Sequence, residues 1–136
     1  MLDAGIQHED GPLLNGNETV LVVDDNEGIR LFLNDALPVF GYSVICAEDG
    51  LDGLNKFSEN KDKIHVALLD IVMPKLNGIE LFKRIKKLEP NTKVLFMSGY
   101  NDIFDRNIQH NEIKCISKPF KINTLLKELR EVLDKN

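Results

Sequence analysis

The chain has 136 residues, 43% of them apolar, which suits one domain with a single hydrophobic core. Its formal charge is −5, with 17 basic against 22 acidic residues, so a nucleic-acid-binding surface is not expected. No apolar stretch approaches the ~20 residues of a membrane span, and the N-terminus lacks the pattern of a signal peptide.

The first 17 residues are polar and rich in Gly, Asn and Asp, which indicates a flexible arm or linker over residues 1–17. The domain itself is expected over residues 18–136. Five apolar runs in it are predicted to be strands, near residues 19–24, 42–47, 65–70, 93–97 and 113–116. Three of these runs are almost continuously apolar, which is typical of parallel strands covered on both faces.

Helical spacing of apolar residues fills the gaps between the strands. The first helix is expected to be capped by Asn26 and to end or kink at Pro38, before Gly41. Further helices are predicted near residues 50–59, 79–85, 101–110 and 122–133, the segment 101–110 being the weakest pattern and expected to be mobile. This alternation predicts an α/β fold with a doubly wound parallel sheet.

Polar side chains stand where four of the apolar runs stop. Asp24 and Asp25 follow the first run, Asp70 the third, Ser98 the fourth and Lys118 the fifth. At the carboxyl ends of parallel strands they would gather at one edge, where open α/β sheets bind ligands. Each residue alone suits a turn or a helix cap, so the interpretation depends on all of them together.

Three clustered carboxylates would repel one another unless a cation lay between them. Mg²⁺, or Mn²⁺, suits such a site because it prefers oxygen ligands and retains waters. A carboxylate can attack phosphorus to form an aspartyl-phosphate, and the metal and a lysine then offset the charge of the transferring group. Lys118 and Ser98 are the candidates to contact its oxygens.

Four segments carry a family resemblance: VLVVDDN at 20–26, LDIVMPKLNG at 69–78, FMSGY at 96–100 and SKPF at 117–120. With these motifs the chain resembles the receiver domain of two-component response regulators, from about Glu18 to the C-terminus. The resemblance implies a flavodoxin-like three-layer sandwich around a five-stranded parallel sheet in the order 2-1-3-4-5.

The resemblance also implies roles for the site residues. Asp70 would be the phosphoacceptor, Ser98 the switch hydroxyl and Lys118 the phosphate partner. Mg²⁺ would be bound by Asp25, Asp70 and the backbone carbonyl of Val72, with Asp24 acting through water. The family's Lys-Pro bond is commonly cis, which is expected here for Lys118–Pro119.

Two positions bear on switching and lifetime. Cys115 stands three residues before Lys118, where the family usually has an aromatic switch residue, and Tyr100 or Phe104 could partly substitute for it. Val72 and Tyr100 would flank the phosphoryl group without an acid or amide to position water, which predicts slow self-dephosphorylation. Cys46 and Cys115 are interpreted as buried reduced thiols, which favours the cell interior.

The expected function is to accept a phosphoryl group from a phosphohistidine of a histidine kinase or histidine phosphotransfer protein, as a switch rather than a classical enzyme. The segments 15–25 and 96–100 resemble C-terminal receivers of hybrid sensor histidine kinases, and a bacterial, cytoplasmic location is implied. A homodimer stays open. The alternatives are a phosphatase of the haloacid dehalogenase type, a receiver-like interaction module that needs no phosphorylation, and flavodoxin-like cofactor binding.

Overall fold

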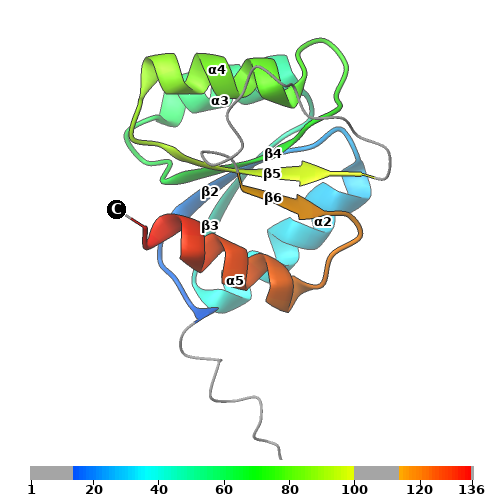
Figure 1. Ribbon diagram of the computed structural model, residues 1–136, viewed down its shortest axis with the longest axis vertical. Coiled ribbons are helices and arrows are strands. Elements are labelled where there is room, and N and C mark those ends of the chain that lie inside the picture. The colour runs from blue at the N-terminus through cyan, green and yellow to red at the C-terminus, as the bar shows by residue number, and fades with distance from the viewer. Residues whose placement is uncertain (1–13, 100–113, 136) are drawn as a thin grey trace, which may run out of the picture.

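The structure, a computed structural model, describes residues 14–99 and 114–135, and it has a sheet covered by helices on both faces (Figure 1). The helix predicted over 101–110, Tyr100, Phe104 and residues 1–13 of the arm lie outside the described residues. In the described ranges no helix has the length and apolar character needed to cross a membrane.

Five parallel strands form the sheet, in the order β3-β2-β4-β5-β6. Counted from one along the chain, this is the predicted order 2-1-3-4-5. The strands are β2 (Thr19–Val23), β3 (Ser43–Ala47), β4 (Val66–Asp70), β5 (Lys93–Ser98) and β6 (Lys114–Ser117). The three continuously apolar runs are the three central strands, because only these have a neighbour on each side and a helical layer on each face.

Three helices that follow strands are capped by the side chain of an Asn or Asp. The caps Asn26, Asp49 and Asn77 each accept a hydrogen bond from the backbone N–H three residues on, at 3.1, 2.8 and 2.9 Å. They start α2 (Glu27–Ala36), α3 (Gly50–Asn60) and α4 (Gly78–Leu88). The capped end of each of these helices therefore lies toward the carboxyl edge of the sheet.

The remaining helical segments close the two layers. As predicted, α2 ends before Pro38, which lies in the 3₁₀ helix η1 (Leu37–Phe40), and Gly41 then turns the chain with a φ of 99°. The last helix is α5 (Ile122–Leu133). Alternate residues of each strand face opposite layers: Val20 and Val22 pack with α2 and α5, and Leu21 and Val23 pack with α3 and α4.

The packed part of the chain extends further toward the N-terminus than Glu18, the start expected from the sequence. Leu14 is buried in the core layer with α2 and α5, and the N–H of Gly16 donates to the carbonyl of Phe40 at 2.9 Å. Arg130 of α5 donates to the carbonyl of Asn15 at 3.2 Å. Residues 14–17 are thus packed against the domain, which the polar composition of the segment concealed.

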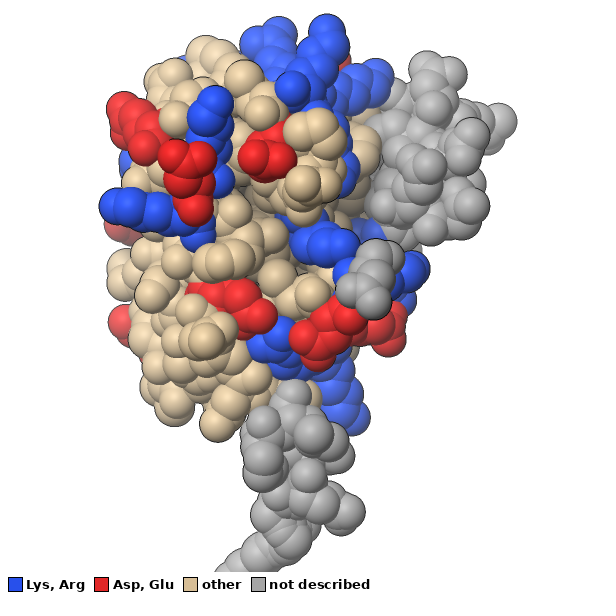
Figure 2. Space-filling view, turned by 90° about the vertical axis from the view of Figure 1, so that its left-hand side faces the viewer, with Lys and Arg blue, Asp and Glu red and all other residues tan. Residues whose placement is uncertain are grey.

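Figure 2 looks onto the edge where the strands begin and shows acidic and basic side chains interspersed. At this edge Arg130 forms two hydrogen bonds with Glu18, at 2.9 and 2.8 Å, and two with Asp134, at 3.3 and 2.7 Å. Its guanidinium also lies 6.0 Å from the centre of the Tyr42 ring. This network ties the first strand to the last helix, away from the acidic residues at the opposite edge.

Candidate functional site

The polar residues singled out from the sequence meet at the carboxyl edge of the sheet. Asp24 and Asp25 follow β2, while Asp70 and Ser98 are the last residues of β4 and β5. Lys118 follows β6, and its backbone N–H donates to the carbonyl of Ser98 at 2.8 Å. Parallel strands in this register carry their last residues to one place, which is why side chains far apart in sequence become neighbours.

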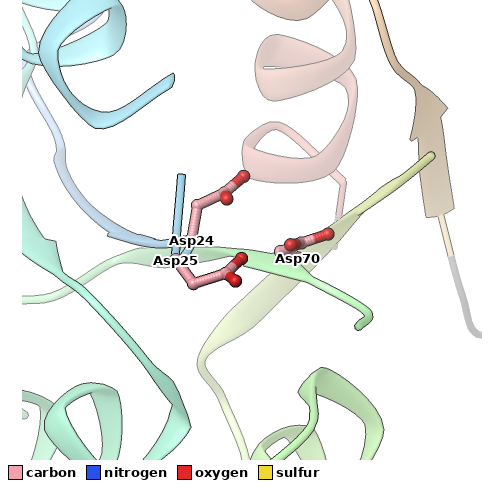
Figure 3. A group of neighbouring side chains, drawn as sticks. All are labelled: Asp24, Asp25 and Asp70. Atoms are coloured by element: carbon pink, nitrogen blue, oxygen red, sulfur yellow. The ribbon is translucent and has the colours of Figure 1, made fainter. Parts of the chain in front are cut away.

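The three carboxylates lie side by side in this edge (Figure 3). Each of Asp24, Asp25 and Asp70 offers an oxygen within 4.8 Å of the others. Asp24 is fully buried and Asp70 is 5% exposed, whereas Asp25 is exposed. The group therefore opens to solvent on one side, as a site for an incoming ligand must.

Lys118 is the positive charge of the site. Its Nζ lies 2.9 Å from Asp24 Oδ2 and 3.2 Å from Asp70 Oδ1, so one ammonium is shared by two carboxylates. The Lys118–Pro119 peptide bond is cis, the geometry expected from the sequence. One lysine among three aspartates leaves an excess of two negative charges.

Burial and the charges of the site change the pKa values of Asp70 and Lys118. Burial, followed by the negative charge of Asp24, raises the pKa of Asp70 to about 6, although Lys118 opposes the rise. Burial alone lowers the pKa of Lys118, but its hydrogen bonds with and attraction to Asp24 and Asp70 outweigh this and raise it. Lys118 is therefore charged at neutral pH, and Asp70 is mostly ionised but held in an unfavourable environment.

Asp24 is oriented by its own loop. Its Oδ1 accepts the N–H of Asn26 at 2.9 Å, and its backbone carbonyl accepts a hydrogen bond from Arg30 Nη1 at 2.8 Å. Its Oδ2 is buried and faces Lys118, whose Nζ lies 2.9 Å away. Sequence reasoning missed Arg30. Arg30 lies one turn after the cap Asn26, and from there a side chain can reach back to the end of the strand. This spacing could have indicated its role.

The loop after Asp70 is held tightly at both ends. The N–H of Gly78 donates to the carbonyl of Ile71 at 2.8 Å, and a side chain at Gly78 would overlap the carbonyl of Asp70. Between these anchors the side chain of Val72 is 59% exposed beside the site. A glycine at position 78 is thus required for α4 to approach the end of β4.

The residues expected to transmit the signal are only partly described. Ser98 is half-buried at the end of β5, and Tyr100 lies outside the described residues. Cys115 pairs with Phe96 across β5 and β6 and packs, half-buried, on the layer of α3 and α4. Neither Cys46 nor Cys115 forms a disulfide within the described ranges, and both are half-buried rather than fully buried as expected, because each lies on an edge strand.

A family model for the response regulator receiver domain matches residues 20–130. The chain belongs to this family. Receivers of two-component systems serve phosphorelay signal transduction, and that is the function of this domain. The phosphatase and flavodoxin-like alternatives are not supported by this match.

Curated relatives include both free-standing and composite proteins. Sporulation initiation phosphotransferase F of Bacillus subtilis is 33% identical over 121 residues, which cover 88% of this chain and 93% of the relative. Sensor kinase CckA of Brucella abortus is 33% identical over 124 residues, which cover 90% of this chain but only 13% of that kinase.

Solved receiver structures share the fold. Chemotaxis protein CheY4 of Vibrio cholerae superposes with a TM-score of 0.75 at 29% identity, over 87% of this chain and all of that one (100%). The receiver domain of the hybrid histidine kinase CckA gives a TM-score of 0.73 at 28% identity, over 85% of this receiver and 98% of that chain.

Proposed function

We propose that this receiver accepts a phosphoryl group on Asp70 from a phosphohistidine of a histidine kinase or histidine phosphotransfer protein, in a Mg²⁺-dependent reaction. The observation that carries the proposal is a nearly buried carboxylate, Asp70, with an ammonium 3.2 Å away and two further carboxylates within 4.8 Å. A carboxylate whose charge is poorly solvated by its surroundings is primed to take up a cation and an electrophile.

The donor set fits Mg²⁺. Asp25 and Asp70 would bind it directly together with the backbone carbonyl of Val72, and Asp24 would act through a bound water. The excess of two negative charges, and the three carboxylate oxygens within 4.8 Å of one another, both favour a hydrated divalent cation. Mn²⁺ has the same ligand preferences. The bound cation would supply charge neutralisation at the phosphoryl oxygens.

The remaining steps depend on residues of the chain itself. A carboxylate oxygen of Asp70 attacks the phosphorus, the new O–P bond forms as the P–N bond to the donor imidazole breaks, and the imidazole leaves with the electron pair. Lys118 holds one phosphoryl oxygen by charge and hydrogen bonding, and the Ser98 hydroxyl donates to another. Movement of Ser98 toward the phosphoryl group would shift the equilibrium between two conformations, with Cys115 in place of an aromatic partner.

The helix that follows Asp25 offers a surface for a protein donor. On α2, which begins two residues after Asp25, Leu31 and Phe32 are 58% and 43% exposed. Large exposed apolar side chains are typical of a protein-binding surface. We place the domain in a bacterial cytoplasm, and we favour the receiver of a hybrid kinase over a free-standing regulator because segments 15–25 and 96–100 resemble that type.

The phosphorylated state should be long-lived. Val72 offers a branched apolar side chain beside the site and no group to position an attacking water. Tyr100, the other residue expected to flank the phosphoryl group, lies outside the described residues. We therefore expect a half-life well beyond seconds once the phosphodonor is removed.

Intact-mass spectrometry after incubation with acetyl phosphate and Mg²⁺ tests the proposal. We expect a single added phosphoryl group, which disappears with EDTA and in Asp70→Asn. The matched variant Asp35→Asn, which removes an exposed carboxylate of α2, should be phosphorylated like the wild type. Phosphorylation that persists in Asp70→Asn would overturn the assignment, and decay within seconds after donor removal would contradict the predicted lifetime.

A further inference from the structure

The loop between β4 and α4, residues 71–77, contains an unusual backbone conformation. Lys75 has a φ of 70°, and across residues 14–99 and 114–135 it is the only non-glycine residue with a positive φ. A side chain in this region is disfavoured because its Cβ approaches the following carbonyl. The surroundings must therefore hold Lys75 in place, and the same loop carries the Val72 carbonyl.

Asp49 is the residue that meets Lys75. Its Oδ1 accepts the N–H of Asp52 at 2.8 Å and so caps α3, while its Oδ2 lies 3.3 Å from Lys75 Nζ. The N–H of Asp52 first, and Lys75 in addition, hold the pKa of Asp49 below its ordinary value in spite of burial. Asp49 is only 7% exposed, so a charged carboxylate is fixed against the loop from a different element.

A second contact joins α3 to the loop at the neighbouring position. A Cβ at Gly50 would overlap the backbone carbonyl of Leu76, so α3 and the loop touch there backbone to backbone. Leu76 itself is buried, at 8% exposure. The Asp49–Lys75 ion pair therefore lies next to a tight backbone contact. Together the two contacts oppose displacement of the loop backbone relative to α3.

We propose that Asp49 is a positioning residue for the metal site: through Lys75 it holds the loop so that the Val72 carbonyl faces the bound Mg²⁺. This rests on the proposed function, because it assigns that carbonyl to the metal. Neither residue touches the reacting atoms. The ion pair offsets the unfavourable backbone at position 75, so a glycine at that position would make the charge of Asp49 unnecessary.

Three variants test the proposal: Asp49→Asn, Lys75→Gly and the double variant. Asparagine retains the oxygen that caps α3 but loses the charge. The readouts are the Mg²⁺ concentration for half-saturation of the site, measured by calorimetric titration without a phosphodonor, and the rate of phosphorylation by acetyl phosphate at saturating Mg²⁺. Asp49→Asn should raise the half-saturating concentration roughly threefold, the effect of a partly exposed ion pair, and leave the saturated rate unchanged. In the Lys75→Gly background the same substitution should change neither.

Lys127→Met, which removes an exposed lysine from α5 on the other face of the sheet, is the control for loss of one charge. Should Asp49→Asn fail to fold, Lys75→Met breaks the same ion pair from the loop side and should give the same shift. An unchanged half-saturation in Asp49→Asn, or an equal shift in the Lys75→Gly background, overturns the proposal. If wild-type protein shows no Mg²⁺-dependent phosphorylation, the proposed function itself fails.

Discussion

Replacing Asp70, the proposed phosphoacceptor, should make the metal-free protein more stable. Asp70 is 5% exposed and its pKa is raised from 3.8 to about 6, so the folded state binds a proton more tightly than the unfolded state does. Ionising Asp70 therefore costs folding free energy. This cost is absent below pH 4, grows as the pH rises toward 6, and is fully present at pH 7. Asp70→Asn cannot ionise and should escape it.

The magnitude follows from the size of the shift. A rise of about two pH units corresponds to about 3 kcal/mol at most, since one unit is worth about 1.4 kcal/mol. We expect Asp70→Asn to be about 2 kcal/mol more stable than the wild type at pH 7, and nearly equal to it at pH 4. Added Mg²⁺ should stabilise the wild type and remove much of this difference, because it binds the folded state with Asp70 ionised.

Urea unfolding in EDTA measures the difference. The chain has no tryptophan, so far-ultraviolet circular dichroism is the suitable signal. Asp35→Asn is the matched control, since it removes an exposed carboxylate and should change stability little at either pH. A variant at position 70 that is no more stable than the wild type at pH 7, or a gain that is equal at pH 4 and pH 7, would refute the electrostatic reasoning.

Two further predictions concern the fold around the site. Glu18 has its pKa lowered to about 2, chiefly by Arg130, so its contribution is present above pH 4.5 and is lost as the pH falls toward 2. Glu18→Gln should lower the free energy of unfolding at pH 7 by about 2 kcal/mol, and this loss should become smaller in acid. Glu59→Gln is the exposed control. A loss of stability that does not depend on pH would contradict this prediction. Gly78→Ala should cost about 2 kcal/mol because its Cβ overlaps the carbonyl of Asp70, whereas Gly28→Ala in α2 should be neutral or stabilising in the same unfolding assay. Equal effects of the two alanines would contradict the steric argument.

Much of the local structure could be predicted from residue patterns. The cap at Asn26 and the helix end before Pro38 depend on residues within a few positions of each other, and both were confirmed. The buried central strands were also recognisable, because a strand covered on both faces needs an unbroken apolar run. The packing of residues 14–17 was not predicted, because the Arg130 side chain that donates to the carbonyl of Asn15 is 115 residues away and no local pattern indicates such a contact.

The residue types of the site could be predicted from the sequence, but their electrostatic interactions could not. That three carboxylates and a lysine end successive strands was visible directly, and their gathering follows from parallel strands alone. The sharing of Lys118 between Asp24 and Asp70, and the raised pKa of Asp70, depend on distances of about 3 Å and on burial. These are set by packing between elements.

The sequence by itself determined which polar residues end the strands of the sheet and, through a family resemblance, predicted the order of the strands. Only the tertiary structure decided how those residues are held. Arg30 fastens the backbone at Asp24, and Asp49 reaches across to Lys75, although neither pair is linked by a periodic pattern. The physical reason is that hydrophobic periodicity specifies which face of an element is buried, whereas contacts between loops depend on where the packed elements bring their ends.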